Sequence, residues 1–253
     1  MKHRATLVLA LAATALAAAP ARAQGAAVDT AAVGALQRMG IYLNTLNAFQ
    51  VRAEVTTEEV LTDGQKVQIA SVVDLVANRP NRLRVNVSDD RQQRLLLYDG
   101  GTFTLFAPRL NFYASVAAPP SLNELAGALE DRHGIELPLA DLFRWGTPES
   151  RIREITAALV VGPGQVQGTT CEHYAFRQAG LDWQIWIQKG DYPLPCKLVL
   201  TTLTDEARPQ HTVVYSWNLA PSFNAAAFTF VPPADARQIT FAEAAATRLT
   251  RNP

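Results

Sequence analysis

Apolar and polar residues alternate along much of the chain between residues 48 and 117. Val51, Ala53 and Val55 are separated by charged or polar neighbours, and the same period of two returns in segments 67–75, 83–87 and 103–105, the last of which is expected to pair with segment 95–97. This period indicates β-strands with one buried face. Asp63-Gly64 and Asp99-Gly100 are turn signals between these segments. This part of the chain is therefore predicted to form an antiparallel sheet built from hairpins.

The pattern changes to a helical period in two places. Asp29 is a candidate cap for a helix over residues 30–46, in which Gly34 and Gly40 predict a bend. After Pro119-Pro120, Ser121 and Glu124 have the spacing of a capping box, and apolar residues then recur on one face as far as Gly134. A second short helix is expected from residue 138, with residues 139, 142 and 143 facing inward.

Strands are expected again at 157–161, 171–178, 182–188, 196–202 and 211–219, with a terminal stretch at 228–233; the Gly162-Pro163-Gly164 sequence between the first two predicts a turn. The total is about ten antiparallel strands with a central helical pair. So long an open sheet curls, and its concave face must be covered. The fold class is therefore α+β, mainly β: a curled antiparallel sheet forming an incomplete β-barrel with a helical lid. Apolar runs at 95–97 and 197–200 require a second covering layer, so the N-terminal helix and the central pair are expected on opposite sides.

The N-terminus has the pattern of a secretory signal peptide. Basic residues 2–4 precede an apolar run at 5–19, and Ala21-Arg22-Ala23 is a small-x-small cleavage signal. The alternative is a membrane anchor, but the run is shorter than the ~20 residues of a spanning helix. We predict a signal peptide over residues 1–23 and a single domain over 24–253, without stable membrane insertion.

Two cysteines, Cys171 and Cys196, follow the predicted cleavage point. An even number of cysteines in an oxidising compartment favours a disulfide, and closing this loop of about 25 residues would contribute about 3 kcal/mol. The alternatives are a metal pair or a redox pair. The spacing is far from Cys-x-x-Cys, and His173 alone does not complete a metal site.

The sequence offers little catalytic chemistry. Acidic and basic residues balance at 23 each, and cleavage would remove Lys2, Arg4 and Arg22, so the mature surface lacks the basic excess of a nucleic-acid partner. His133 and His211 belong to separate predicted elements, as does His173, so no metal site is expected. Motifs for a nucleophile or a phosphate loop are also missing. We therefore predict a protein that is not an enzyme and needs no cofactor.

Six segments together resemble the DUF2092 group of predicted periplasmic proteins, within the wider class that folds like the lipoprotein carriers LolA and LolB. These segments are residues 78–84, 97–100, 105–108, 182–187, 193–197 and 228–233. The resemblance covers about residues 30–240 and implies a LolA-like half-barrel whose apolar concavity lies beneath helices. In the carriers the concavity receives acyl chains of lipoproteins. The resemblance also implies a periplasmic location.

The expected site is an apolar cavity between the sheet and the lid. Trp183 and Trp186 fall on opposite faces of one strand, and sequence alone leaves open which one faces the core. The residues predicted to line the cavity and lid are Val85, Leu95, Leu97, Phe103, Leu105, Leu122, Leu125, Leu129, Leu142, Phe143, Trp183 and Trp217. We expect a monomer that binds lipid or an acylated protein there. The alternative is an envelope protein whose sheet is a docking surface for another protein, without lipid.

Overall fold

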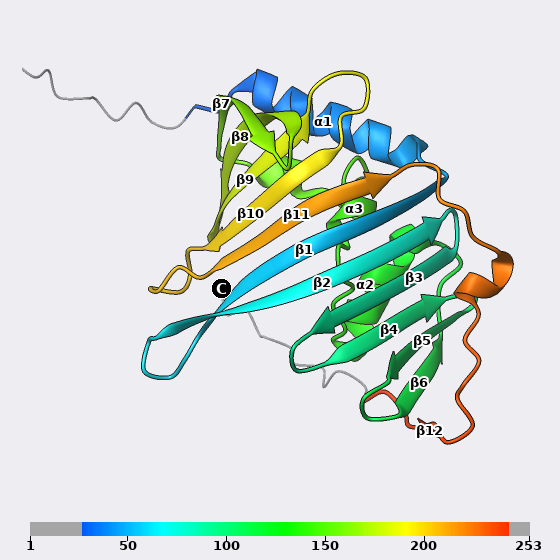
Figure 1. The fold of residues 1–253 in the computed structure, drawn as a ribbon. Helices are drawn as coiled ribbons and strands as arrows, with labels where there is room; N and C mark the ends of the chain where they lie inside the picture. Colours follow the sequence, from blue (N-terminus) through cyan, green and yellow to red (C-terminus); the bar gives the residue numbers. More distant parts are fainter. Residues whose placement is uncertain (1–26, 243–253) are drawn as a thin grey trace, which may run out of the picture.

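The computed structural model describes residues 27–242, so the predicted signal peptide lies outside the described residues. The described part contains one open, curled sheet in the strand order β12-β6-β5-β4-β3-β2-β1-β11-β10-β9-β8-β7 (Figure 1). Neighbouring strands are antiparallel, except that β12 pairs with β6 in parallel. The predicted fold class, a curled half-barrel with helices on its concave face, is confirmed.

Six strands meander from the centre of the sheet to one edge. They are β1 (Ala48–Val60), β2 (Lys66–Asn78), β3 (Arg82–Asp89), β4 (Gln93–Tyr98), β5 (Thr102–Ala107) and β6 (Phe112–Ala117). The predicted hairpin turns are present. Asp99 Oδ1 accepts from the backbone N–H groups of Gly101 and Thr102, at 3.0 and 2.8 Å. These bonds satisfy backbone donors that the turn would otherwise leave free.

The second run of strands returns from the opposite edge to the centre. It comprises β7 (Ala157–Val166), β8 (Thr169–Gln178), β9 (Leu181–Gln188), β10 (Pro195–Thr202) and β11 (Gln210–Asn218). β11 pairs with β1, for example Tyr215 opposite Ala53. The predicted turn at Gly162-Pro163-Gly164 is wrong: these residues lie within β7, after a register shift between Val160 and Gly162. Proline is tolerated there because β7 is the edge strand and needs no N–H on its outer side.

The chain crosses from β6 to β7 through helices α2 (Leu122–His133) and α3 (Asp141–Arg144) and the 3-10 turn η1 (Arg151–Glu154). The Ser121 side chain accepts from the Glu124 N–H, and Gly134 ends α2 in the left-handed conformation, as predicted. The second helix is shorter than predicted. Leu139 has a φ of +58°, which interrupts the helix, so α3 begins at Asp141.

Helix α1 (Thr30–Thr45) begins at the predicted cap, where Asp29 accepts a hydrogen bond from the Ala31 N–H. Its buried side chains Leu36, Met39 and Leu43 join the same core cluster as the buried side chains of α2 and α3. The expectation that α1 and the central helices cover opposite sides is therefore wrong. All three helices cover the concave face, which lies behind β1–β3 in Figure 1.

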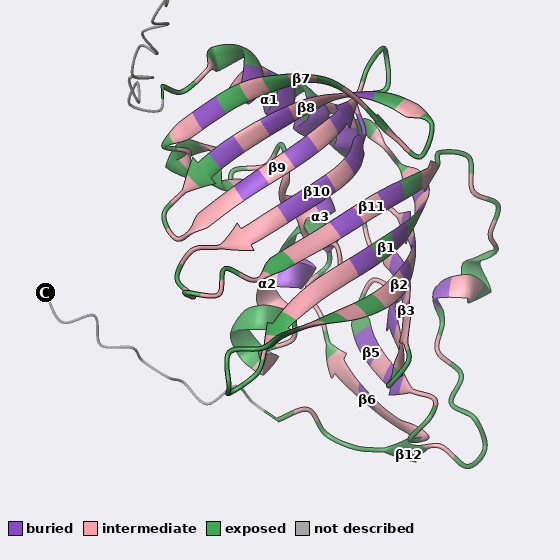
Figure 2. Cartoon of the chain, turned by 60° about the vertical axis from the view of Figure 1, so that its left-hand side comes forward, coloured by how far each residue is buried: buried purple, intermediate pink, exposed green. Residues whose placement is uncertain are grey.

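The outer face of β3–β6 is covered by the chain between β11 and β12 (Arg237–Gln238), including the 3-10 turn η2 (Ala225–Phe228). Arg84 donates from Nη1 to the Ala227 carbonyl oxygen at 3.2 Å. The Phe230 ring lies 5.5 Å from that of Phe106 and 5.1 Å from that of Tyr113. This segment is the second layer that the apolar run at 95–97 required. Figure 2 shows the banding of buried and less buried residues along the strands.

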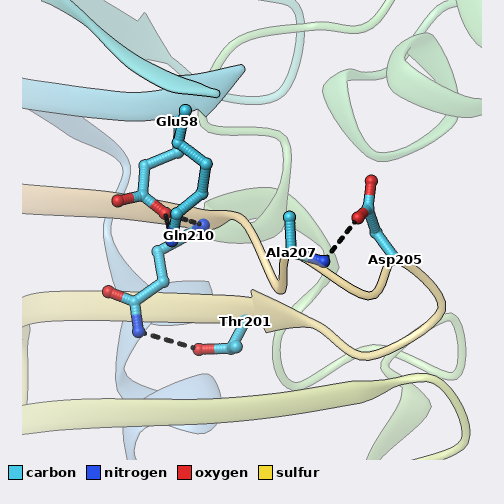
Figure 3. A network of polar contacts seen from close by, with 6 residues as sticks. Glu58, Thr201, Asp205, Ala207 and Gln210 are labelled. Atoms are coloured by element: carbon cyan, nitrogen blue, oxygen red, sulfur yellow. Dashed lines mark hydrogen bonds and ion pairs between the residues drawn. The ribbon is translucent and has the colours of Figure 1, made fainter. Parts of the chain in front are cut away.

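The central strands end in a polar network at the β10–β11 turn (Figure 3). The Gln210 N–H donates to Glu58 Oε2 at 2.9 Å, and Gln210 Nε2 donates to Thr201 Oγ1 at 3.2 Å. Asp205 accepts from the Ala207 N–H at 2.8 Å within the turn. These contacts connect β1, β10 and β11 at their solvent-exposed ends and fix the register of the turn.

The predicted disulfide between Cys171 and Cys196 is present, with a sequence separation of 25. It joins β8 to β10, the two neighbours of β9. Cys171 lies opposite Gln188, the last residue of β9, and Cys196 lies at the irregularity where β10 begins to pair with β9. The bridge therefore spans the end of β9 and connects strands that are not adjacent in the sheet.

Candidate ligand-binding concavity

The concave face is a continuous apolar surface. Alternate residues of the strands point toward the helices and form one core cluster with them. From the β6 side to the β7 side this surface includes Phe103, Tyr98, Leu96, Val85, Leu75, Val51, Tyr215, Leu198, Ile185 and Phe176, all buried. The concavity is therefore lined almost entirely by aliphatic and aromatic side chains.

Most of the predicted site residues are brought together here. Val85, Phe103 and Trp183 lie on the sheet side of the cluster, with Leu105 and Trp217 partly buried against it. The helices contribute Leu122, Leu125, Leu129, Leu142 and Phe143, each no more than 2% exposed.

Leu95 and Leu97 lie on the wrong face for the predicted site. Leu96 and Tyr98 belong to the concave core, so their neighbours in the strand point outward. Leu97 is nevertheless 3% exposed, and Leu95 lies opposite Phe106, which the C-terminal segment covers. Because these leucines are covered from one side or the other, the apolar run does not indicate which of them faces inward. Leu96 is the residue of this run that faces the helices.

The concavity is filled in this structure. The ring centres of Phe49 and Phe143 lie 6.1 Å apart, and those of Phe49 and Trp217 lie 5.8 Å apart. Helix α3 therefore packs directly on the concave face of the sheet. The residues predicted to line an open cavity instead pack against one another. The filling groups on one side belong to α2 and α3, which the chain inserts between the two halves of the sheet. A ligand could occupy this space only after these helices move.

The start of α2 is held by two hydrogen bonds, one to the β2–β3 turn and one from the β4 side chain Tyr98. Leu122 donates its N–H to the Pro80 carbonyl oxygen at 2.9 Å, and the Tyr98 hydroxyl donates to the Pro119 carbonyl oxygen. Burial raises the pKa of the Tyr98 phenol, so it remains a neutral donor. These contacts fix the segment before α2 to the β2–β3 turn and to β4.

Arg79 connects the sheet to both lid helices. It lies in the turn between β2 and β3, and its Nη1 donates to Asn123 Oδ1 of α2 at 3.0 Å. Its guanidinium carbon lies 5.5 Å from the ring centre of Phe143 in α3. Nε and Nη2 are buried and have no hydrogen-bond partner. Burial lowers the pKa of this guanidinium. Sequence patterns indicate only a turn at this position.

A groove of about 840 Å³ borders this contact. Asn123, the acceptor of Arg79, lines it together with Ile41 and Asn44 of α1 and residues 146–149. Glu124, Asp131 and Glu149 also line it and are exposed. The groove opens between α1, α2 and the turn after α3, so its shape depends on the position of the lid.

A second pocket of about 890 Å³ lies at the β7 edge. It is lined by Ala27 and Asp29 before α1 and by the neighbouring ends of β7, β8 and β9, including Leu159, Phe176 and Trp183. Trp183 is the predicted lining residue that contacts this pocket. Beside it, Leu159 and Val161 of β7 are 57% and 51% exposed.

The two tryptophans of β9 have different surroundings. Trp183 faces the core and stacks on Phe176 with ring centres 4.4 Å apart. Trp186 faces outward between His173, at 3.9 Å between ring centres, and the Lys197 ammonium, at 4.9 Å from its ring centre. Both sides of the Trp186 ring are therefore occupied by groups of the protein itself.

Titratable groups within the concavity are few. Burial raises the pKa of the Asp141 carboxyl and of the Tyr215 phenol, and it lowers the pKa of the His211 imidazole. His211 Nδ1 lies 2.8 Å from Thr57 Oγ1. No cluster of three or more His, Cys, Asp or Glu side chains within residues 27–242 could hold a metal ion.

A family model described as "Predicted periplasmic protein (DUF2092)" matches residues 32–242. The chain belongs to the DUF2092 family. The match extends from α1 to the end of the described region, so it includes the sheet, the lid and the C-terminal segment on the outer face. Within the described residues, no helix combines the length and hydropathy needed to cross a membrane. A search of curated proteins found no match.

Similar solved structures include an uncharacterized conserved protein from Thermus thermophilus, with 11% identity, coverage of 83% of this chain and 99% of that chain, and a TM-score of 0.48. LprF from Mycobacterium bovis is 14% identical, over 78% of this chain and 96% of that chain, with a TM-score of 0.46. A LolA superfamily protein from Nitrosomonas europaea is 10% identical, over 79% and 97%, with a TM-score of 0.35.

Proposed function

We propose that this DUF2092 protein is a non-enzymatic periplasmic binding protein for lipid or for lipid-modified protein. The acyl chain would lie along the concave face of the sheet, beneath α2 and α3. The chain would reach the periplasm through a cleaved signal peptide over residues 1–23 and act as a monomeric single domain. The structure described above would then be the closed, unloaded form.

The main support for this proposal is the part of the chain that supplies the side chains filling the concavity. They come from a helical insertion, and the sheet itself presents an uninterrupted apolar surface beneath it. The insertion is held by hydrogen bonds at the start of α2, by Arg79, by the Asn44 side chain, which donates to the Trp145 carbonyl oxygen, and by apolar packing, and the Cys171–Cys196 disulfide does not involve it. Apolar packing is not directional, so an acyl chain can replace the lid side chains without leaving polar groups unpaired.

The free energy gained by burying an acyl chain is similar in size to the free energy lost by exposing the lid side chains. An acyl chain that buries ~400 Å² gains about 10 kcal/mol at ~25 cal/mol per Å², before ordering costs. Displacing Leu122, Leu125, Leu129, Leu142 and Phe143 from the sheet costs about 1.5–3 kcal/mol per side chain if each becomes exposed. Loading and release would therefore be nearly balanced, which suits a carrier that must give up its cargo.

Native mass spectrometry of the mature protein purified from its own host tests this proposal. We expect a population whose excess mass corresponds to one lipid or one acylated protein, and this population should disappear after extraction with organic solvent. Extracted protein should regain the excess mass on incubation with host lipid. A mass equal to the polypeptide alone, both before extraction and after this incubation, would contradict lipid carriage.

A docking role without lipid is the second candidate function. The observation that favours it is the pair of exposed aliphatic residues Leu159 and Val161 on the edge strand, beside the β7 pocket. A partner protein could cover this edge. Cross-linking in cells through a photoreactive residue at position 159 should then give one dominant protein adduct. The same residue at Leu110, which is 70% exposed on the opposite side of the sheet, is the control.

A further inference from the structure

Arg79 is a partly buried cation without an anionic partner, and the Nε and Nη2 atoms of its guanidinium are themselves buried. Its single side-chain hydrogen bond goes to the neutral amide oxygen of Asn123, and two of its nitrogen atoms have no partner. Five ion pairs occur among residues 27–242, and none includes Arg79. Buried charges in proteins are normally paired. The arrangement therefore leaves capacity to bind an anion.

Nearby carboxylates do not neutralise the charge of the Arg79 guanidinium. The lowering of its pKa has burial as its cause, with no contribution from an acidic group. Glu124, the acid in the first turn of α2, is exposed to solvent, where its field is screened. The remaining favourable contact is the face of the Phe143 ring, and a cation–π contact is worth about 0.5–2 kcal/mol. That is less than burying a charge typically costs.

The position of Arg79 connects its unused capacity to bind an anion with movement of the lid helices α2 and α3. Its two contacts with the lid are Asn123 in α2 and Phe143 in α3. Any ligand that lifts these helices from the sheet removes both contacts and exposes the guanidinium to whatever has entered. The N-terminal end of α2, a helix of 12 residues, lies beside it and adds the positive end of a helix dipole.

We propose that Arg79 binds the anionic headgroup, a carboxylate or a phosphate, of the amphiphile whose acyl chain enters the concavity. The guanidinium fork would exchange one neutral acceptor for a bidentate, charge-assisted pair. This inference rests on the proposed lipid-binding function and makes it more specific. The preferred cargo is an anionic amphiphile, with its chain under the lid and its headgroup at the β2–β3 turn.

Calorimetric titration of the delipidated mature protein with palmitate and with methyl palmitate, at pH 8, tests this proposal. The two ligands share the acyl chain and differ in the charge of the headgroup. We expect wild type to bind palmitate at least about 10-fold more tightly than the ester, a ratio that corresponds to about 1.4 kcal/mol. Arg79→Gln should bind both ligands with similar affinity, whereas Arg82→Gln, at the start of β3, should keep the wild-type preference.

Equal affinities in wild type, or a preference that survives in Arg79→Gln, would overturn the headgroup assignment while leaving lipid binding intact. If neither ligand binds to any variant, the proposed function itself fails. Should Arg79→Gln not fold, Arg79→Lys keeps the charge but loses the fork, and a reduced preference in this variant would support the proposal. Inorganic phosphate is the last probe: tight binding of phosphate alone to wild type but not to Arg79→Gln would indicate a free-anion site and overturn the headgroup assignment.

Discussion

Gly40 of α1 and Gly146 in the turn after α3 approach so closely that neither has room for a side chain. A Cβ atom on Gly40 would lie 2.5 Å from the Gly146 backbone nitrogen. Asn44, one turn further along α1, donates from Nδ2 to the carbonyl oxygens of Gly40 and Trp145, each at 3.0 Å. Gly40, read from sequence as the cause of a bend, instead allows α1 to contact the chain that follows the lid.

Gly40→Ala is expected to destabilise the protein despite the higher helix propensity of alanine. The propensity gain is about 1 kcal/mol, whereas overpacking against backbone costs typically about 1–3 kcal/mol or more. Gly34→Ala in the same helix is the matched control, because its new Cβ would meet only the flexible end of Arg38 at 3.4 Å. Urea unfolding should show a lower midpoint for Gly40→Ala and an equal or higher one for Gly34→Ala. The reverse order would contradict the close contact.

The disulfide should contribute to global stability. Removing a link that closes a loop of 25 residues is expected to cost about 3 kcal/mol in the chain-entropy model. The double variant Cys171→Ala/Cys196→Ala should therefore unfold at lower urea concentration, and wild type treated with a reducing agent should behave in the same way. An unchanged midpoint in both samples would mean that the bridge adds no stability.

The contribution of His211 to stability is expected to be lost as the pH drops below about 6.5, whereas the raised pKa of the Asp141 carboxyl acts in the opposite direction. Burial lowers the pKa of His211 in the folded state, so the unfolded chain takes up a proton that the folded chain resists. The stabilising contribution is complete above the unfolded pKa and is lost as the pH falls toward the folded pKa. The pKa of His173 is also lowered by burial, so it acts in the same direction.

Unfolding curves of wild type and His211→Gln between about pH 8 and pH 5 measure this effect, because the range spans the ordinary histidine pKa. Glutamine can still bond to Thr57 but does not titrate in this range, so the variant should lose less stability on acidification. His173→Gln is the comparison for the second, less buried imidazole. If the free energy of unfolding depended on pH in the same way in wild type and in His211→Gln, His211 would not be a cause of the loss of stability.

Sequence patterns predicted the elements that depend on local chemistry. The capping box at Ser121 and Glu124 and the turn at Asp99 were found because their side chains bond to backbone groups a few residues away. The tertiary features were not local. Leu139 looks like an ordinary apolar helix residue, and its left-handed conformation arises from the way the chain turns into α3. Likewise, nothing around Arg79 in the sequence indicates that it touches both lid helices.

The sequence could not show which face of the sheet Leu96 and Leu97 each occupy, and the reason is different. Alternation identifies a face only when one face is polar, and here the C-terminal segment buries the outer side as deeply as the helices bury the inner one. The two residues are neighbours with almost equal exposure, 2% and 3%, on opposite sides of one strand. They therefore allow stability and ligand binding to be separated.

Leu96→Ala and Leu97→Ala should each cost about 2–5 kcal/mol of unfolding free energy, because both side chains are buried. Only Leu96 faces the proposed acyl site, so only Leu96→Ala should change the affinity for palmitate. Unfolding and palmitate titration of both variants, at a temperature where both are folded, give the two measurements. If Leu97→Ala altered affinity as much as Leu96→Ala, the ligand would not lie on the concave face. Equal losses of stability with a selective loss of binding in Leu96→Ala would place the acyl chain between the sheet and the lid.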